Sequence, residues 1–79
     1  MKAAIEISMY PLNEEYEPPI LDFIGRLNKY SGIRVQTNSM STQISGEYDV
    51  IMDILQQEMK TSFERGKTVA MVMKVIKLG

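Results

Sequence analysis

The chain has 79 residues, of which 44% are hydrophobic and 24% are charged, and its net charge is −1. This length predicts one small domain over residues 1–79, for which self-association commonly supplements a thin stability. Cysteine and histidine are absent, which excludes disulfides, thiolate nucleophiles, Ser–His–Asp catalysis and ordinary zinc sites. The near-neutral net charge does not indicate the basic surface that nucleic-acid-binding proteins carry.

The chain shows neither a membrane span nor a secretory signal. No apolar run approaches the roughly 20 residues that cross a bilayer. Lys2 and Glu6 place charges where a signal peptide would be apolar. We therefore expect a cytoplasmic protein with no membrane partner.

The first half of the chain predicts a strand, a helix and a second strand. Residues 3–10 alternate between apolar and polar side chains, which is typical of a strand with one buried face. A polar connection at 13–17 leads to Pro18-Pro19, and proline is tolerated in the first turn of a helix. Residues 33–38 alternate again. The predicted helix carries an apolar stripe at three- and four-residue spacing, formed by Ile20, Phe23, Ile24 and Leu27. Ser31 continues this line, and Gly32 is the predicted end of the helix.

The second half predicts a strand, a helix and a last strand. Asn38 and Ser39 are residue types that favour a turn, so a strand at 40–47 should form a hairpin with the preceding strand. Gly46 should mark a bulge in this strand or its end. A helix at 49–64 should close at Gly66. Residues 68–76 predict a strand that is apolar on both faces. The buried face of the second helix is predicted to carry Ile51, Ile54, Leu55, Met59 and Phe63.

The element order is β-α-β-β-α-β, the split βαβ plan of ferredoxin-like α+β sandwiches. This plan has a four-stranded antiparallel sheet in the order 4-1-3-2, with two helices on one face. The other face stays open, and the last strand would leave apolar side chains there. Uncovered apolar surface of this kind marks interfaces, so we expect a homodimer built on the open sheet face or on a strand edge.

Two short motifs stand where apolar runs meet turns: residues 8–12 (SMYPL) and residues 40–43 (MSTQ). Pro11 should end strand pairing because it has no N–H to donate. In the order 4-1-3-2 the end of the first strand lies beside the start of the third. Met9 and Thr42 should therefore be cross-strand partners or diagonal neighbours at one rim of the sheet.

At these residues the chain resembles the YkoF-like thiamine/hydroxymethylpyrimidine-binding family, which is related to small ferredoxin-like thiamine-binding domains. The resemblance rests on residues 6–12 (EISMYPL), on residues 40–46 (MSTQISG) and on the acidic Glu47 that follows. The element order fits over essentially all 79 residues.

The resemblance implies a soluble carrier or sensor in thiamine uptake or salvage that binds thiamine or its pyrimidine part without catalysis. It implies that Met9 and Thr42 contact this small-molecule ligand. Thiamine would be a bound ligand, and we expect no cofactor, no metal and no catalytic residue. The family's namesake has two such units in tandem, so two copies of this chain would associate, as a dimer or a dimer of dimers.

The residues of the two motifs also allow structural readings. The Thr42 hydroxyl suits the ring nitrogens and amino group of an aminopyrimidine, but a β-branched residue also simply favours a strand. The Met9 thioether can lie on an aromatic ring or pack in the core. Ser8 and Ser41 are further hydrogen-bonding candidates or exposed strand residues, and Tyr10 can stack on a heteroaromatic ring or support the rim.

Other functions are possible on the same fold. An acylphosphatase-type enzyme needs a phosphate-cradling loop after the first strand, whereas residues 11–15 read PLNEE and would repel phosphate. An RNA-binding domain would stack bases on aromatic residues of its central strands, and residues 40–47 contain none. A small-ligand regulatory or oligomerisation domain with a different ligand stays open, because a fold does not fix a function.

Overall fold

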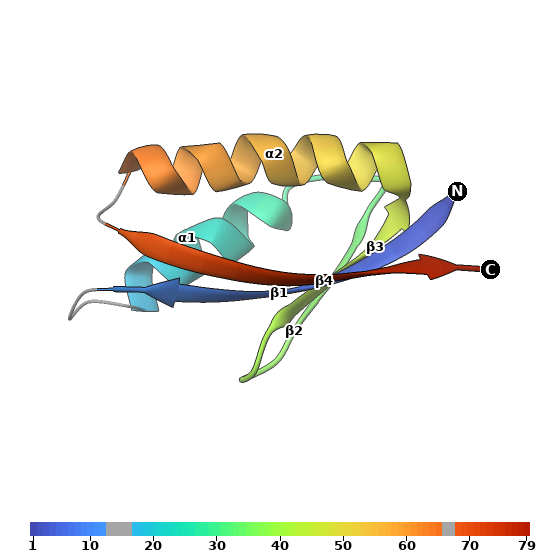
Figure 1. The fold of residues 1–79 in the computed structure, drawn as a ribbon. Helices are drawn as coiled ribbons and strands as arrows, with labels where there is room; N and C mark the ends of the chain where they lie inside the picture. Colours follow the sequence, from blue (N-terminus) through green and yellow to red (C-terminus); the bar gives the residue numbers. More distant parts are fainter. Residues whose placement is uncertain (13–16, 66–67) are drawn as a thin grey trace.

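Four strands and two helices follow one another in the order β-α-β-β-α-β (Figure 1). The computed structural model describes residues 1–12, 17–65 and 68–79. The predicted connection before Glu17 and the predicted stop at Gly66 lie outside these residues. The elements are β1 (Lys2–Pro11), α1 (Glu17–Leu27), β2 (Arg34–Thr37), β3 (Thr42–Glu47), α2 (Tyr48–Arg65) and β4 (Val69–Leu78).

The sheet has the order β2-β3-β1-β4, and all its pairings are antiparallel. This is the predicted order 4-1-3-2 in reverse, so the ferredoxin-like prediction is confirmed. The central strand β1 pairs with β3 from Lys2 to Ile7 and with β4 from Lys2 to Pro11. Within the described part of the chain, the end of β1 therefore extends past β3, and its strand pairing continues with β4.

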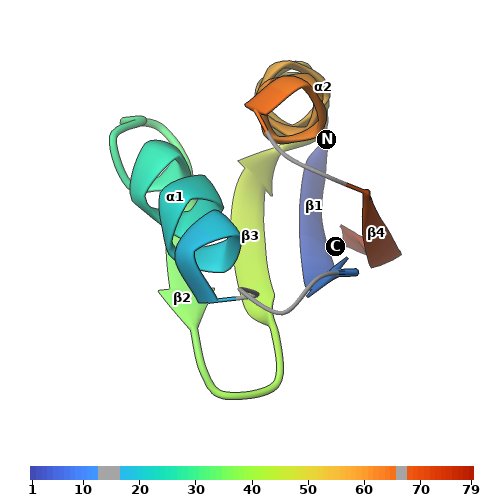
Figure 2. The same cartoon turned by 90° about the vertical axis from the view of Figure 1, so that its left-hand side faces the viewer.

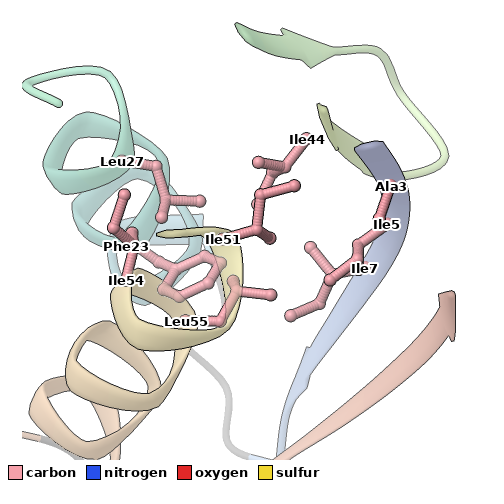
Figure 3. Packing of buried hydrophobic residues seen from close by; sticks show 9 residues of the cluster. All are labelled: Ala3, Ile5, Ile7, Phe23, Leu27, Ile44, Ile51, Ile54 and Leu55. Carbon is pink, nitrogen blue, oxygen red and sulfur yellow. The ribbon is translucent and has the colours of Figure 1, made fainter. Parts of the chain in front are cut away.

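Both helices pack on one face of the sheet, and the core lies between them and the two central strands (Figure 1). Strand alternation points every second side chain of β1 and β3 toward the helices, and these side chains are almost completely buried. Figure 3 shows them meeting side chains from α1 and α2. The core consists of Ala3, Ile5, Ile7, Phe23, Leu27, Ile44, Ile51, Ile54 and Leu55.

The predicted buried face of α2 is correct except at its end. Phe63 is 52% exposed, whereas its neighbour Ser62 is buried. A helix turns by about 100° per residue, so Ile51, Leu55 and Ser62 stay near one line and Phe63 lies well away from it. Ser62 is tolerated in this position because its hydroxyl accepts a hydrogen bond from the Arg26 guanidinium.

Several element boundaries differ from the predicted ones. Helix α1 ends at Leu27, and i to i+3 bonds such as Tyr30 N–H to the Leu27 carbonyl oxygen continue the turn toward Gly32, which has a φ of +86°. Strand β3 begins at Thr42 instead of residue 40. Gly46 forms no bulge but pairs with Ala3 inside β3, where an added Cβ would lie 3.2 Å from the Gly32 carbonyl oxygen.

Pro11 does not end strand pairing, because it pairs with Val69. The next N–H, that of Leu12, donates to the Thr68 carbonyl oxygen at 2.9 Å. Neighbouring residues in an antiparallel strand direct their backbone groups to opposite sides, so the Pro11 nitrogen faces the β3 side. Strand β3 does not extend that far, and the missing N–H costs no ladder bond.

A polar network joins the two helices. The Arg26 guanidinium donates to the Glu58 carboxylate, to the Glu58 carbonyl oxygen at 2.9 Å and to the Ser62 hydroxyl. The Tyr30 hydroxyl donates to the other Glu58 carboxylate oxygen. Side chains of Arg26 and Glu58 are only 12% and 13% exposed, so this ion pair is largely removed from water.

Burial by itself raises the pKa of the Glu58 carboxyl, but hydrogen bonds from Tyr30 and Arg26 and the Arg26 charge together lower this pKa below its ordinary value of 4.5. A carboxyl whose folded pKa is lowered stabilises the fold above its unfolded pKa and loses that contribution as the pH falls through the folded value. We therefore expect the free energy of unfolding to fall more steeply below about pH 4.5 in the wild-type chain than in a Glu58→Gln variant.

This pH dependence can be measured by urea unfolding between pH 3 and pH 7. Glu64→Gln is the matched control, because Glu64 is an exposed glutamate on the same helix. Wild type and control should show the same acid slope. A Glu58→Gln variant with an unchanged acid slope would contradict the assignment.

Candidate functional site

A cavity of about 200 Å³ opens between α1 and the rim of the sheet where β1 ends and β3 begins. Its walls are residues 7–10 of β1, residues 37–42 of the β2–β3 hairpin, and Ile20, Phe23 and Ile24 of α1. Figure 1 shows the end of β1 and the start of α1 on the same side of the molecule. Pockets for drug-sized ligands measure roughly 300–1,000 Å³, so this one suits a single small ring.

Met9 and Thr42 lie on the helix-facing side of the sheet and line this cavity. Thr42 pairs with Ile7 in β1 and with Thr37 in β2. Met9 is two residues beyond Ile7, which makes Met9 and Thr42 diagonal neighbours on the same face. The sequence predicted that Met9 and Thr42 would be either cross-strand partners or diagonal neighbours, and the observed register shows that they are diagonal neighbours.

Thr42 is buried, with 5% of its surface exposed. Its hydroxyl oxygen lies 3.4 Å from the hydroxyl oxygen of Thr37. This contact is long for two hydroxyl groups, whose usual separation is about 2.7–2.8 Å. The Thr42 hydroxyl is therefore only weakly held and can turn toward a group in the cavity.

Ser8, Tyr10 and Ser41 also border the cavity. Strand alternation points the Ser8 and Tyr10 side chains toward the open face, as it does that of Glu6. The Ser41 hydroxyl donates to a Glu6 carboxylate oxygen at 3.1 Å. The Ser8 hydroxyl donates to the Met40 carbonyl oxygen at 3.5 Å. The structure thus brings all five predicted site residues to one rim, while separating Met9 and Thr42 from the other three by the plane of the sheet.

The hairpin turn is built by Asn38, which the sequence identified only as turn chemistry. Its side-chain oxygen accepts from the backbone N–H groups of Met40 and Ser41, at 2.8 and 3.0 Å. The backbone N–H of Asn38 donates to the Ser41 carbonyl oxygen at 3.0 Å. These bonds shape the loop that precedes Thr42, and this loop forms one wall of the cavity.

Helix α1 supplies the apolar wall of the cavity, and its residues there were predicted only as core residues. Phe23 is buried, and Ile20 and Ile24 are half-buried beside it. Their three- and four-residue spacing was visible in the sequence. One turn of this stripe borders the cavity because β3 begins at Thr42, two residues after the start predicted from the sequence.

The cavity's side chains combine apolar surface with a few hydrogen-bonding groups. Among its described lining residues, Tyr10 alone has a titratable side chain. In the described ranges 1–12, 17–65 and 68–79, no group of three Asp and Glu side chains is placed to hold a metal ion. The arrangement can hold a ring by contact and direct it with hydroxyl and backbone groups.

None of the helices described here is long and apolar enough to cross a membrane.

The fold and the hollow at its rim define a ferredoxin-like domain with a small-ring cavity on its helix-facing side. The chain belongs to the thiamine-binding protein family, whose match covers residues 5–77. This confirms the family resemblance carried by the two motifs and supports a thiamine-related role. No curated protein matches the chain.

Solved structures share the fold at low sequence identity. A protein from Streptococcus pneumoniae has a TM-score of 0.88 and 23% identity, over 100% of this chain and 88% of its own. A Thermotoga maritima protein, described as a candidate thiamine biosynthesis/salvage protein, has a TM-score of 0.87 and 18% identity over 99% and 85%. A hypothetical protein from Methanocaldococcus jannascii has a TM-score of 0.83 and 24% identity over 99% and 81%.

Proposed function

We propose that the chain binds thiamine, or its hydroxymethylpyrimidine moiety, in the cavity between α1 and the sheet rim, and releases it unchanged. It would act in the cytoplasm as a carrier or sensor in thiamine uptake or salvage. The observation that carries this proposal is the hollow at the junction of the two motifs, in a chain of the thiamine-binding protein family.

The chemistry of the cavity supports an aminopyrimidine ring as the ligand. The Met9 thioether and the Phe23 wall offer polarizable and apolar contact to the faces of a ring. The Thr42 hydroxyl can both donate to a ring nitrogen and accept from an amino group. The small volume favours the pyrimidine over the whole vitamin, so the thiazolium part of thiamine would extend out of the cavity.

The lining also supports binding without catalysis. General acid–base chemistry needs a titratable group within hydrogen-bond reach of the reacting atom. The described wall offers only Tyr10, whose side chain points toward the open face of the sheet. We propose that thiamine is a ligand here and that the chain is not an enzyme.

We also propose that the chain is a homo-oligomer, a dimer or a dimer of dimers. Exposed apolar side chains on β4 support this, and they include Val72, Val75 and Ile76, each more than half exposed. A domain of this size buries a modest share of its surface, so association adds stability.

Isothermal titration calorimetry tests the proposed ligand. Thiamine and hydroxymethylpyrimidine should both release heat with one site per chain, whereas the isolated hydroxyethyl-methylthiazole should release none. Absence of heat and of a thermal shift with both pyrimidine ligands at millimolar concentration would overturn the proposal and favour a regulatory domain with another ligand. Mass spectrometry of the recovered ligand tests the non-catalytic part, because any conversion would contradict it.

A further inference from the structure

The loop between β2 and β3 forms one wall of the cavity, at a point where the backbone pairing of β1 with β3 has ended. This loop consists of residues 38–41, and all four line the cavity. The last pair between β1 and β3 is Ile7 with Thr42. Figure 2 shows the loop projecting away from α2. The position of this wall therefore depends on contacts beyond the β1–β3 ladder.

Two side chains of β1 continue the attachment past the end of the ladder. The Glu6 carboxylate accepts a hydrogen bond from the Ser41 hydroxyl at 3.1 Å. The Ser8 hydroxyl donates to the Met40 carbonyl oxygen at 3.5 Å, which is long for a hydroxyl donor. A hydrogen bond to an ionised acceptor is also the stronger kind, so the bond to Glu6 is the main one. Glu6 and Ser8 point to the open face of the sheet and hold the loop from the side opposite the cavity.

The sheet itself places the Glu6 carboxylate. Glu6 lies on the central strand between Gln43 of β3 and Lys74 of β4. Its Oε1 atom lies 3.7 Å from the Lys74 ammonium, while its Oε2 atom accepts from Ser41. Lys74 is 82% exposed, so its ion pair adds little energy. The hydrogen bond to Ser41 therefore carries the attachment, and it starts from a strand that is paired on both sides.

The bonds within the loop extend this attachment to the cavity wall. The Asn38 side-chain oxygen accepts from the backbone N–H groups of both Met40 and Ser41, which makes the loop one unit. Ser41 directly precedes Thr42, whose hydroxyl faces the cavity. Holding Ser41 therefore fixes both the wall and the backbone next to Thr42.

We propose that Glu6 is a positioning residue of the cavity, and that its bond to Ser41 holds the loop at 38–41 in the arrangement that binds the ligand. The inference rests on the proposed function, because it concerns hydroxymethylpyrimidine in that cavity. It gives Ser8 and Ser41 the role of holding the loop in place of contacting the ligand. A ligand that binds only one arrangement loses apparent affinity in proportion to the population of that arrangement.

Amide hydrogen exchange of the ligand-free protein, followed by NMR, tests the attachment. Glu6→Ala should raise the exchange rates of the Met40 and Ser41 amides about fivefold, the factor expected for losing one hydrogen bond of ordinary net strength. Glu6→Gln keeps an oxygen acceptor and should restore slow exchange. The matched control is Gln43→Ala, because Gln43 lies opposite Glu6 and is exposed on the same face. This control should keep the wild-type rates.

Calorimetry with hydroxymethylpyrimidine tests the effect on binding through a double-mutant cycle. Glu6→Ala and Ser41→Ala should each weaken binding about threefold, because each removes the same bond. The variant with both substitutions should also lose about threefold. If Ser41 contacted the ligand independently of Glu6, the two losses would multiply to about ninefold. Gln43→Ala should bind with the wild-type constant.

Unchanged loop exchange in Glu6→Ala would overturn the positioning role, and so would losses of affinity that multiply. Ser41→Ala removes the same bond from the loop side, so its exchange rates decide the question if Glu6→Ala does not fold. A wild-type chain that gives no heat with hydroxymethylpyrimidine would overturn the proposed function. The attachment of the loop by Glu6 would still be decided separately, by the exchange rates of the ligand-free protein.

Discussion

Replacing Arg26 by methionine should lower the free energy of unfolding by about 3 kcal/mol, the lower end of the range for breaking a buried ion pair. The change leaves the Glu58 carboxylate, which is only 13% exposed, without its cation. It also removes the donor to the buried Ser62 hydroxyl. Urea unfolding followed by circular dichroism measures the loss, which is a large share of the total stability of a small domain.

Two controls separate the buried pair from general effects of removing an arginine. Arg65 is 57% exposed and pairs with Asp22 at 2.8 Å, so Arg65→Met should cost less than about 1 kcal/mol. Replacing Arg26 and Glu58 together by methionine should recover much of the loss, because it leaves no unpaired charge. Equal effects of Arg26→Met and Arg65→Met would show that the network between the helices contributes little.

Replacing Thr42 by valine should weaken the binding of hydroxymethylpyrimidine by about tenfold or more. Valine keeps the β-branched shape that suits the strand, but it lacks the hydroxyl and leaves a polar atom of the ligand unpaired in the cavity. Such an unpaired buried group costs about 1–3 kcal/mol, and 1.4 kcal/mol corresponds to a factor of ten. Calorimetry with the wild type and the variant measures the ratio of the dissociation constants.

Thr61→Val is the matched control for this substitution. Thr61 lies on α2, outside the cavity, and its hydroxyl donates to the Gln57 carbonyl oxygen. The control should bind the ligand with the wild-type constant. If Thr42→Val also keeps that constant while the thermal stability of the two variants is similar, Thr42 supports the strand and does not bind the ligand.

The sequence was sufficient for the fold because its local signals agree. Alternation over residues 3–10 and the helical stripe through Phe23 and Leu27 follow from the periods of strand and helix. The connection at Asn38-Ser39 is so short that the two strands it joins must form an antiparallel hairpin. These local signals predicted the strand order, and the observed order confirms it.

The sequence was less informative about the end of α2, where Phe63 and Ser62 are both candidates for the buried face of the helix. Phe63 was predicted to be buried because it is large and apolar, yet the line of the helix places Ser62 there. The contact that makes this acceptable, from Arg26 on the other helix, connects residues 36 positions apart. No local pattern can indicate such a partner.

The candidate site shows the same division. The sequence alone determined that Met9 and Thr42 stand near one rim, because strand order follows from element order and alternation. Alternation in the sequence also set Met9 opposite Ser8 and Tyr10 on β1. The tertiary structure decided that Thr42 shares the helix-facing side with Met9 and α1. The reason is that a register shift of one residue reverses every side chain of a strand. That register is set by long-range pairing of β1 with β3, which only the folded chain displays.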